Sequence, residues 1–251
     1  MEIFLHDLIT KVLKFVFGNK NEDWNDFWKE KIKRGRFIEL EDSFQQKVYA
    51  KTHKKLMTFL GSIVGKSILE IGAGSGYDSI LLATKGANKV TLVDKSIYAL
   101  QYSKFLSQKL KVLDKIEFIH GDCRFLPVKE ESYDIVLSTG LLEHFGDDDI
   151  IQILSECKRV MKKNAKMAMT VPNLISPEIV YRILRDGGIG SERHLSKRRL
   201  MRLFREAGFK NIKIQSASAS VIPSCINVNL LSQLIDILTP LDYLRTVICE
   251  K

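Results

Sequence analysis

Residues 67–76 read Ser-Ile-Leu-Glu-Ile-Gly-Ala-Gly-Ser-Gly. A short apolar run reaches a glutamate and then breaks into glycines at alternate positions, after which apolar residues return at helical spacing. Glycine has no Cβ, so its backbone can turn sharply and lie close to a ligand. A strand, a glycine-rich turn and a helix in this order predict the nucleotide-binding start of a doubly wound α/β fold.

The spacing of the glycines and the acid before them narrow the choice of ligand. The dinucleotide fingerprint is G-x-G-x-x-G, with a pyrophosphate at the helix N-terminus, whereas this chain has G-x-G-x-G with Glu70 two residues before Gly72. A carboxylate beside the turn would repel a pyrophosphate and suits a ligand that carries an amino group. A tight turn without any ligand is the alternative interpretation.

A second acid follows the next predicted strand. The run Val90–Val93 ends in Asp94, which lies 24 residues after Glu70 and near the ~20-residue offset of a ribose-binding acid. A carboxylate there can accept hydrogen bonds from both ribose hydroxyls. The alternative is a helix N-cap, because Asp94 or Ser96 precedes the predicted helix Ile97–Leu110. Combined with the glycine loop, the offset favours the ligand.

Strands and helices alternate along most of the chain. Apolar runs predict strands near residues 67–71, 89–93, 115–120, 133–138, 165–171 and 210–217, and helical spacing predicts helices near 76–85, 96–110 and 148–161. The first five strands are expected to be parallel, because helices connect them. The sequence therefore predicts an α/β fold: a doubly wound, Rossmann-like, mostly parallel seven-stranded sheet with helices on both faces and an N-terminal helical cap.

This order of elements resembles the class I S-adenosylmethionine-dependent methyltransferases, of the small-molecule, type 11-like group, over roughly residues 44–216. The resemblance implies S-adenosyl-L-methionine as cofactor, with the glycine loop under its methionine part and Glu70 at its amino end. An acid at the position of Asp122 meets the adenine amino group in that family, and the fourth strand forms a wall of the site. The cofactor-binding residues implied by the resemblance are Glu70, Gly72, Ala73, Gly74, Gly76, Asp94, Lys95, Asp122, Cys123 and Thr139.

The motifs contain no universal catalytic residue, because a sulfonium cofactor carries an already activated methyl group. Positioning alone can contribute ~7–11 kcal/mol, and a base is useful where the acceptor must lose a proton. His144, which follows the fourth strand, is the first candidate for this base, and His194 is the second. The alternatives are that His144 caps or packs a helix or lines the cofactor pocket, and that His194 binds a helix N-terminus.

Three regions are expected along the chain. They are an N-terminal helical cap over residues 1–60, a cofactor-binding core over 61–217 with a lid insertion at about 173–196, and a C-terminal extension over 218–251. Trp24, Phe27 and Trp28 share one helical face of the cap. The apolar N-terminal helix and the apolar C-terminal tail are the two candidates for peripheral membrane contact.

The cysteines, the terminal residues and the net charge limit the possible metal content, location and partners. Four widely spaced cysteines without a CxxC pair or a Cys/His cluster predict reduced thiols and no metal site. Acids near the N-terminus and the lack of a small-residue cleavage site argue against a secretory signal, and no stretch reaches the ~20 apolar residues of a membrane span, so the predicted location is cytoplasmic. The net charge of +9 makes nucleic acid a possible but less favoured partner.

The predicted activity is methyl transfer to an O, N or C atom of a small metabolite, such as a lipid, a quinone precursor or a sugar-linked molecule. Residues 138–141 read Ser-Thr-Gly-Leu, not the Asn/Asp-Pro-Pro-aromatic run of amino-methylating DNA enzymes. Two alternatives stay open, an RNA or protein methyltransferase that uses the basic surface and a non-catalytic subunit that binds S-adenosylmethionine. The sequence leaves the oligomeric state and the acceptor undetermined.

Overall fold

A computed structural model describes residues 23–35, 53–173, 192–216 and 244–251. Its helices and strands, in chain order, are α2 (Trp24–Lys33), β1 (Ser67–Ile71), α4 (Tyr77–Thr84), β2 (Lys89–Asp94), α5 (Ile97–Lys109), β3 (Ile116–His120), β4 (Tyr133–Thr139), α6 (Asp147–Val160), β5 (Met161–Pro172), α8 (Lys197–Glu206), β6 (Lys210–Ser216) and β7 (Leu244–Glu250). Residues 53–60 are also helical, and two short 3₁₀ helices are η1 (Leu113–Lys115) and η2 (Leu142–His144).

The strands form one seven-stranded sheet in the order β3-β2-β1-β4-β5-β7-β6. Neighbouring strands from β3 to β5 pair in parallel, whereas β7 runs antiparallel to both β5 and β6. This confirms the predicted α/β fold with a mostly parallel sheet. The chain moves outward from β1 to β3 and then crosses back to β4, so the order of strands reverses between β1 and β4. Ligands of open α/β sheets bind at the carboxyl ends of the strands beside such a reversal.

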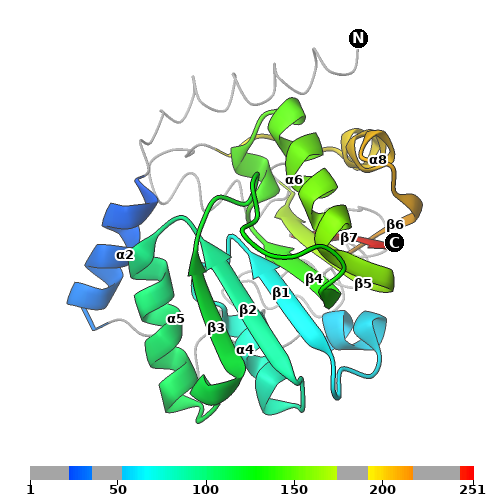
Figure 1. The fold of residues 1–251 in the computed structure, drawn as a ribbon. Helices are drawn as coiled ribbons and strands as arrows, with labels where there is room; N and C mark the ends of the chain where they lie inside the picture. The colour runs from blue at the N-terminus through cyan, green and yellow to red at the C-terminus, as the bar shows by residue number, and fades with distance from the viewer. Residues whose placement is uncertain (1–22, 36–52, 174–191, 217–243) are drawn as a thin grey trace, which may run out of the picture.

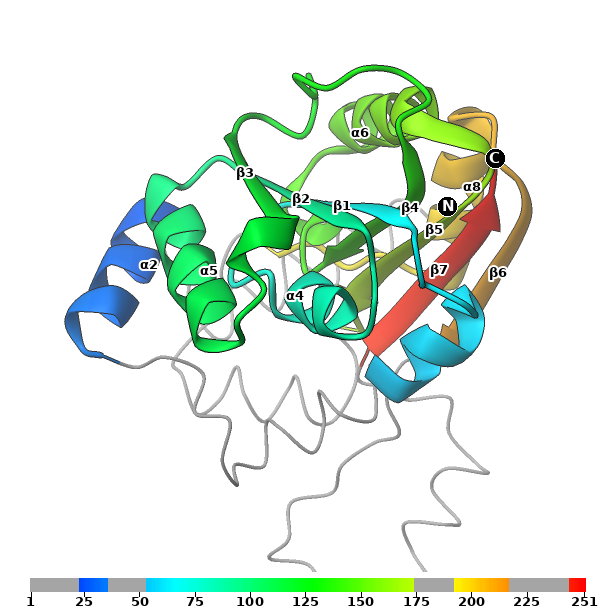
Figure 2. The ribbon, with the colours of Figure 1, turned by 60° about the horizontal axis from the view of Figure 1, so that its bottom comes forward.

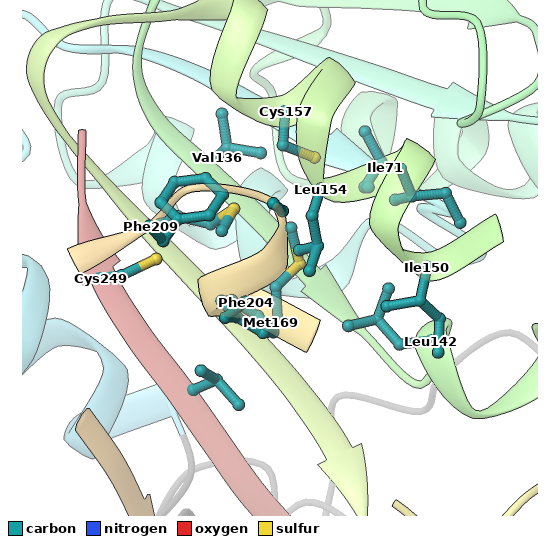
Figure 3. Packing of buried hydrophobic residues seen from close by; sticks show 14 of the residues in the cluster. Ile71, Val136, Leu142, Ile150, Leu154, Cys157, Met169, Phe204, Phe209 and Cys249 are labelled. Atoms are coloured by element: carbon teal, nitrogen blue, oxygen red, sulfur yellow. The ribbon is translucent and has the colours of Figure 1, made fainter. Parts of the chain in front are cut away.

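Helices cover both faces of the sheet, with α4 and α5 on one side and α6 and α8 on the other (Figure 2). Side chains of a strand alternate between its two faces. Thus Leu69 and Ile71 of β1 belong to the core beneath α6 and α8, while Ile68 belongs to the core beneath α4 and α5. Figure 3 shows the first of these cores, where Ile71 and Met169 from the sheet lie near α6 and α8. Burial on both faces explains why the strands read as nearly continuous apolar runs.

Two parts of the sheet differ from the expectation. Strand β5 begins at Met161, directly after α6, and not near residue 165, because Met161 already pairs with Tyr133 across a register shift. Strand β7 comes from the region expected to be a C-terminal extension, and it pairs with β5 and β6 inside the sheet. Buried Val247 and Cys249 join the core beneath α6 and α8.

Of the predicted N-terminal cap, the structure describes residues 23–35 and 53–60. Helix α2 lies alongside α5 (Figure 1), where Trp28 packs with Ala99 and Tyr102. The rest of the predicted cap, most of the predicted lid (174–191) and most of the predicted C-terminal extension (218–243) lie outside the described residues. None of the helices in the described part of the chain is both long enough and apolar enough to cross a membrane.

Candidate functional site

The glycine loop after β1 has the conformation that its sequence predicts. Gly72, Gly74 and Gly76 all have positive φ, at 57°, 53° and 63°, in the left-handed region that other residues rarely adopt. A Cβ on Gly72 would lie 2.5 Å from Leu141 Cδ1, and one on Gly74 would lie 2.9 Å from Trp28 Cζ2. The loop therefore needs glycine both for its backbone and for close approach of its neighbours.

The third glycine of the loop has a packing role in the structure. Gly76 is the N-cap residue of α4, and a Cβ on it would lie 2.6 Å from Leu92 Cδ1 and 3.3 Å from Ile80 Cδ1. These side chains belong to the core beneath α4 and α5. Gly76 thus lets α4 pack closely on β2, the part that the last glycine of such loops commonly has.

Asp94 lies at the carboxyl end of β2 and binds the glycine loop. Its Oδ2 accepts a 2.7 Å hydrogen bond from the Gly74 amide, and its Oδ1 accepts a 2.7 Å bond from the Ser96 amide. The N-cap of α5 is Ser96, whose side chain accepts from the Ala99 amide. Ser96, and not Asp94, is therefore the N-cap of α5, and Asp94 binds the glycine loop instead. Burial raises the pKa of Asp94, and the two amides partly offset that rise.

Glu70 is a buried carboxylate next to the same loop. Its side chain is 4% exposed, and its Oε2 has no hydrogen-bond partner among the described residues. Burial, followed by the negative charge of Asp78, raises the pKa of Glu70 to about 8. A buried carboxylate oxygen without a partner is costly, so the position of Oε2 favours a cation or a hydrogen-bond donor.

The carboxyl end of β3 brings a third acid to this edge of the sheet. The Gly121 amide donates to the Asp94 carbonyl over 3.1 Å, which places Asp122 near the end of β2. Arg124 holds the Asp122 carboxylate through Nε and Nη2, at 3.1 Å to Oδ1 and 2.7 Å to Oδ2. These bonds keep the pKa of Asp122 below its usual value.

Lys95 and Cys123, which directly follow Asp94 and Asp122, differ in exposure. Lys95 is exposed, and its carbonyl accepts a 2.8 Å hydrogen bond from His120 Nε2. Cys123 is buried in the core beneath α6 and α8. Burial raises the pKa of its thiol to about 12, so this cysteine stays a protonated packing residue.

Beyond β4, the chain places a histidine near the loop. His144 ends η2, its side chain is 13% exposed, and its Nε2 lies 3.9 Å from Glu143 Oε1. The Trp24 ring of α2 meets the His144 ring edge-on, with 5.1 Å between centroids. Burial lowers the pKa of His144, and Glu192 partly opposes this. The imidazole is therefore neutral near pH 7.

The second candidate histidine lies on a segment that packs beside η2. The Arg193 amide donates to the Glu143 carbonyl over 2.7 Å, and Arg193 Nη1 donates to the Phe145 carbonyl over 2.9 Å. The next residue, His194, is 2% exposed and lies two residues before Ser196, the N-cap of α8. The end of the predicted lid segment thus returns to the carboxyl edge of β4.

Four residues of this region are not among the site residues predicted from the sequence, although Trp28 was placed with Trp24 and Phe27 on one face of the predicted cap. Trp28 packs over the glycine loop, and Arg124 binds Asp122. Asp78 and His53 form a buried pair with 3.3 Å between Oδ1 and Nδ1. Asp78 lies two residues after the last glycine of the loop, and this position could have indicated from the sequence that it lies near the site. The contribution of His53 depends on a contact across 25 residues that no local pattern reveals.

Comparisons with known proteins agree with this arrangement. A family model described as "Methyltransferase domain" matches residues 68–164. A curated Mycolicibacterium smegmatis protein, named a "Probable S-adenosylmethionine-dependent methyltransferase", is 27% identical over 113 residues, which are 45% of this chain and 40% of that protein. The chain thus spans less than half the length of this relative.

Another relative and a solved structure match over longer stretches. The 27-O-demethylrifamycin SV methyltransferase of Amycolatopsis mediterranei is 24% identical over 204 residues, which cover 80% of this chain and 74% of that protein. A chain from the complex between the Haloferax volcanii Trm112 methyltransferase activator and a methyltransferase has a TM-score of 0.67 at 17% identity, covering 91% of this chain and 97% of that one. That structure supports the fold. Together, the sheet order, the glycine loop and these matches show that residues 68–164 form a methyltransferase domain and that the chain is similar to S-adenosylmethionine-dependent methyltransferases.

Proposed function

We propose that this chain transfers a methyl group from S-adenosylmethionine to an O, N or C atom of a small metabolite. The observation that carries this proposal is the buried Glu70, whose Oε2 lacks a partner beside a glycine loop that Asp94 ties to β2. The cofactor offers an ammonium group to the first acid and ribose hydroxyls to the second. The residues present therefore fit the chemistry of S-adenosylmethionine.

Each cofactor-binding residue has a distinct part in this proposal. Glu70 would bind the ammonium group, Asp94 the ribose hydroxyls and Asp122 the adenine amino group. Gly72, Ala73 and Gly74 would present backbone to the amino-acid part, while Gly76 holds the loop by packing against Leu92. Lys95, Cys123 and Thr139 would complete the walls at the ends of β2, β3 and β4.

Bound S-adenosylmethionine supplies a methyl group activated by its sulfonium charge, so the chain's own task is to orient the acceptor and exclude water. His144 would take up the proton that an O–H or N–H acceptor loses as its new bond to carbon forms. This proton moves to a ring nitrogen of His144, which is able to accept it because burial keeps the imidazole neutral. A carbon acceptor that forms a cation would lose its proton to the same nitrogen.

A small acceptor is favoured over RNA or protein by the way the structure uses its basic residues. Arg199 and Arg202 of α8, part of the most basic stretch, bind Asp147 of α6 with their guanidinium groups. This charge holds two helices together and is not wholly available to an anionic partner. Near His144, the exposed rings of Trp24 and Phe27 offer apolar surface. The rifamycin-methylating relative also acts on a small molecule.

The test begins with calorimetric titration of S-adenosylmethionine into the wild-type protein and into Gly74→Ala. The new methyl group would meet Trp28, so the variant should lose most of its affinity. Gly65→Ala is the matched control, because Gly65 also has a positive φ of 73° but no atom lies within 4 Å of a Cβ placed there. Equal affinity of the two variants would contradict the assigned cofactor site.

The acceptor is then sought with methyl-labelled S-adenosylmethionine and a metabolite extract, with total RNA and protein from the same cells as parallel samples. Label in a small, extractable product supports the proposal. Label in RNA or protein would replace it with the macromolecular alternative. Binding of cofactor without any labelled product would indicate a non-catalytic subunit.

A further inference from the structure

Behind the glycine loop lies a second buried carboxylate. Asp78, the second residue of α4, is 8% exposed, and His53 of the preceding helix is 6% exposed. Asp78 Oδ1 lies 3.3 Å from His53 Nδ1, and Asp78 Oδ2 accepts a 3.5 Å hydrogen bond from Thr139 Oγ1 at the end of β4. Asp78 thus lies where the strand order reverses, between the ends of β1 and β4.

The hydrogen bonds around His53 fix which nitrogen carries the proton. Lys85 Nζ lies 2.9 Å from His53 Nε2, and an ammonium group can only donate hydrogen bonds. Nε2 is therefore the acceptor, so Nδ1 carries the ring proton and donates it to Asp78 Oδ1. This chain of contacts holds the Asp78 carboxylate in a fixed orientation.

Three carboxyl groups lie close together at this point of the fold. Glu70, Asp78 and Asp94 lie close enough for both aspartates to raise the pKa of Glu70. In the part of the chain that the structure describes, no lysine or arginine forms an ion pair with any of the three. Burial of neighbouring carboxyl groups disfavours their charged forms, and an ammonium group bound between them would favour those forms.

We propose that Asp78, positioned by His53, is a second binding carboxylate for the ammonium group of the cofactor, in addition to Glu70. The inference rests on the cofactor use proposed above. It assigns the helix at residues 53–60 a part in cofactor binding, because that helix supplies the side chain that orients Asp78. It also gives the site a preference for ligands whose amino-acid end carries an ammonium group.

The experiment compares two ligands that differ only in that end. S-adenosylhomocysteine carries the ammonium group, whereas 5′-methylthioadenosine keeps the nucleoside and thioether but has no amino acid. We expect Asp78→Asn to weaken S-adenosylhomocysteine binding roughly 10- to 100-fold, the range for a lost hydrogen bond to a charged group, and to change methylthioadenosine binding less than about twofold. An equal loss for both ligands, or no loss for either, would overturn the proposal.

Two further variants separate positioning from folding. His53→Asn keeps an N–H that can reach Asp78, so it should retain most of the affinity for S-adenosylhomocysteine, whereas His53→Leu should lose it. Asp134→Asn is the control, because Asp134 is also a bonded carboxylate but lies at the amino end of β4, where it accepts from the Ser67 amide. If the wild-type protein bound neither ligand, the proposed function would be overturned as well. If the wild type bound both ligands and the Asp78 variant did not show the expected selective loss, only the role of Asp78 would be overturned.

Discussion

The amide of Gly74 and the carboxylate of Asp94 are joined by a 2.7 Å hydrogen bond. The bond connects the loop after β1 to the carboxyl end of β2, so the acid that would bind ribose also holds the loop that would lie under the amino-acid part. Loop conformation and cofactor affinity therefore depend on one side chain. The same carboxylate accepts from the Ser96 amide at the start of α5.

Asp94→Ala should lower both stability and affinity. It leaves the Gly74 and Ser96 amides without their acceptor, and an unsatisfied buried donor costs about 1–3 kcal/mol. We expect the free energy of unfolding to fall by about 2 kcal/mol in urea denaturation. Asp114→Ala, which removes an exposed carboxylate from η1, is the control and should change stability little. A variant as stable as the wild type would show that the loop does not depend on this bond.

Glu70 should make the stability of the unliganded protein depend on pH. Its folded-state pKa of about 8 lies above the usual 4.5, so the folded state keeps a proton that the unfolded state loses. The free energy of unfolding should therefore fall as the pH rises from about 5 to about 8. Glu70→Gln should flatten this slope and be the more stable protein above pH 8, while it binds S-adenosylmethionine more weakly.

The comparison for this variant is Glu117→Gln on β3. Glu117 has its pKa lowered by Lys89 and its side chain is 43% exposed, so its replacement should leave the slope between pH 5 and 8 in place. Urea denaturation across this range, without cofactor, measures both variants. A wild-type protein whose stability rises across the range would contradict the assigned state of Glu70.

Much of the fold could be predicted because its signals are local. The glycine loop, the apolar strands and the helix caps each occupy a few consecutive residues, and the parallel order follows from the helices between strands. Strand β7 could not be placed in the same way. Its pairing with β5 joins residues far apart in sequence, such as Thr170 and Thr246. No local pattern within residues 244–250 indicates which strand they pair with.

The site residues also divide into those that local sequence patterns predict and those that depend on contacts between distant segments. Glu70 and Asp94 precede or follow recognisable strands, so their common position at one edge could be inferred. The pairing of Asp78 with His53 and the contact of Trp28 with the glycine loop depend on how the N-terminal helices pack. Arg124 lies only two residues after Asp122, yet its side-chain direction is set by the turn between them and not by spacing alone.

His144→Ala should lower turnover far more than cofactor affinity. Loss of a general base typically costs 10²–10⁴-fold in rate, whereas the Kd for S-adenosylmethionine should change less than about twofold. Because burial lowers the pKa of His144 from 6.5, wild-type kcat should rise with pH along a limb centred below that value and then level off. Initial rates over this range, with the acceptor identified from the extract, provide the measurement.

His194 gives the contrast for that experiment. Its side chain is 2% exposed, so His194→Asn should lower the melting temperature while the acid limb of the kcat profile stays where it is in the wild type. A variant of His144 with normal turnover would remove it as the base. Loss of the acid limb in the His194 variant would assign the proton transfer to His194 instead.

The two tryptophans of the chain make α2 directly observable. Both lie on this helix, but Trp28 is 9% exposed beside Gly74, whereas Trp24 is 41% exposed beside His144. Trp24→Phe leaves Trp28 as the sole tryptophan, and its emission should be blue-shifted and should respond to S-adenosylmethionine. Trp28→Phe leaves Trp24, whose emission should be red-shifted and should respond less to the cofactor, because its neighbour is the proposed base. A fluorescence response to the cofactor that came from Trp24 alone would contradict a position of Trp28 next to the bound cofactor. Helix α2 would then contact the acceptor and not the cofactor.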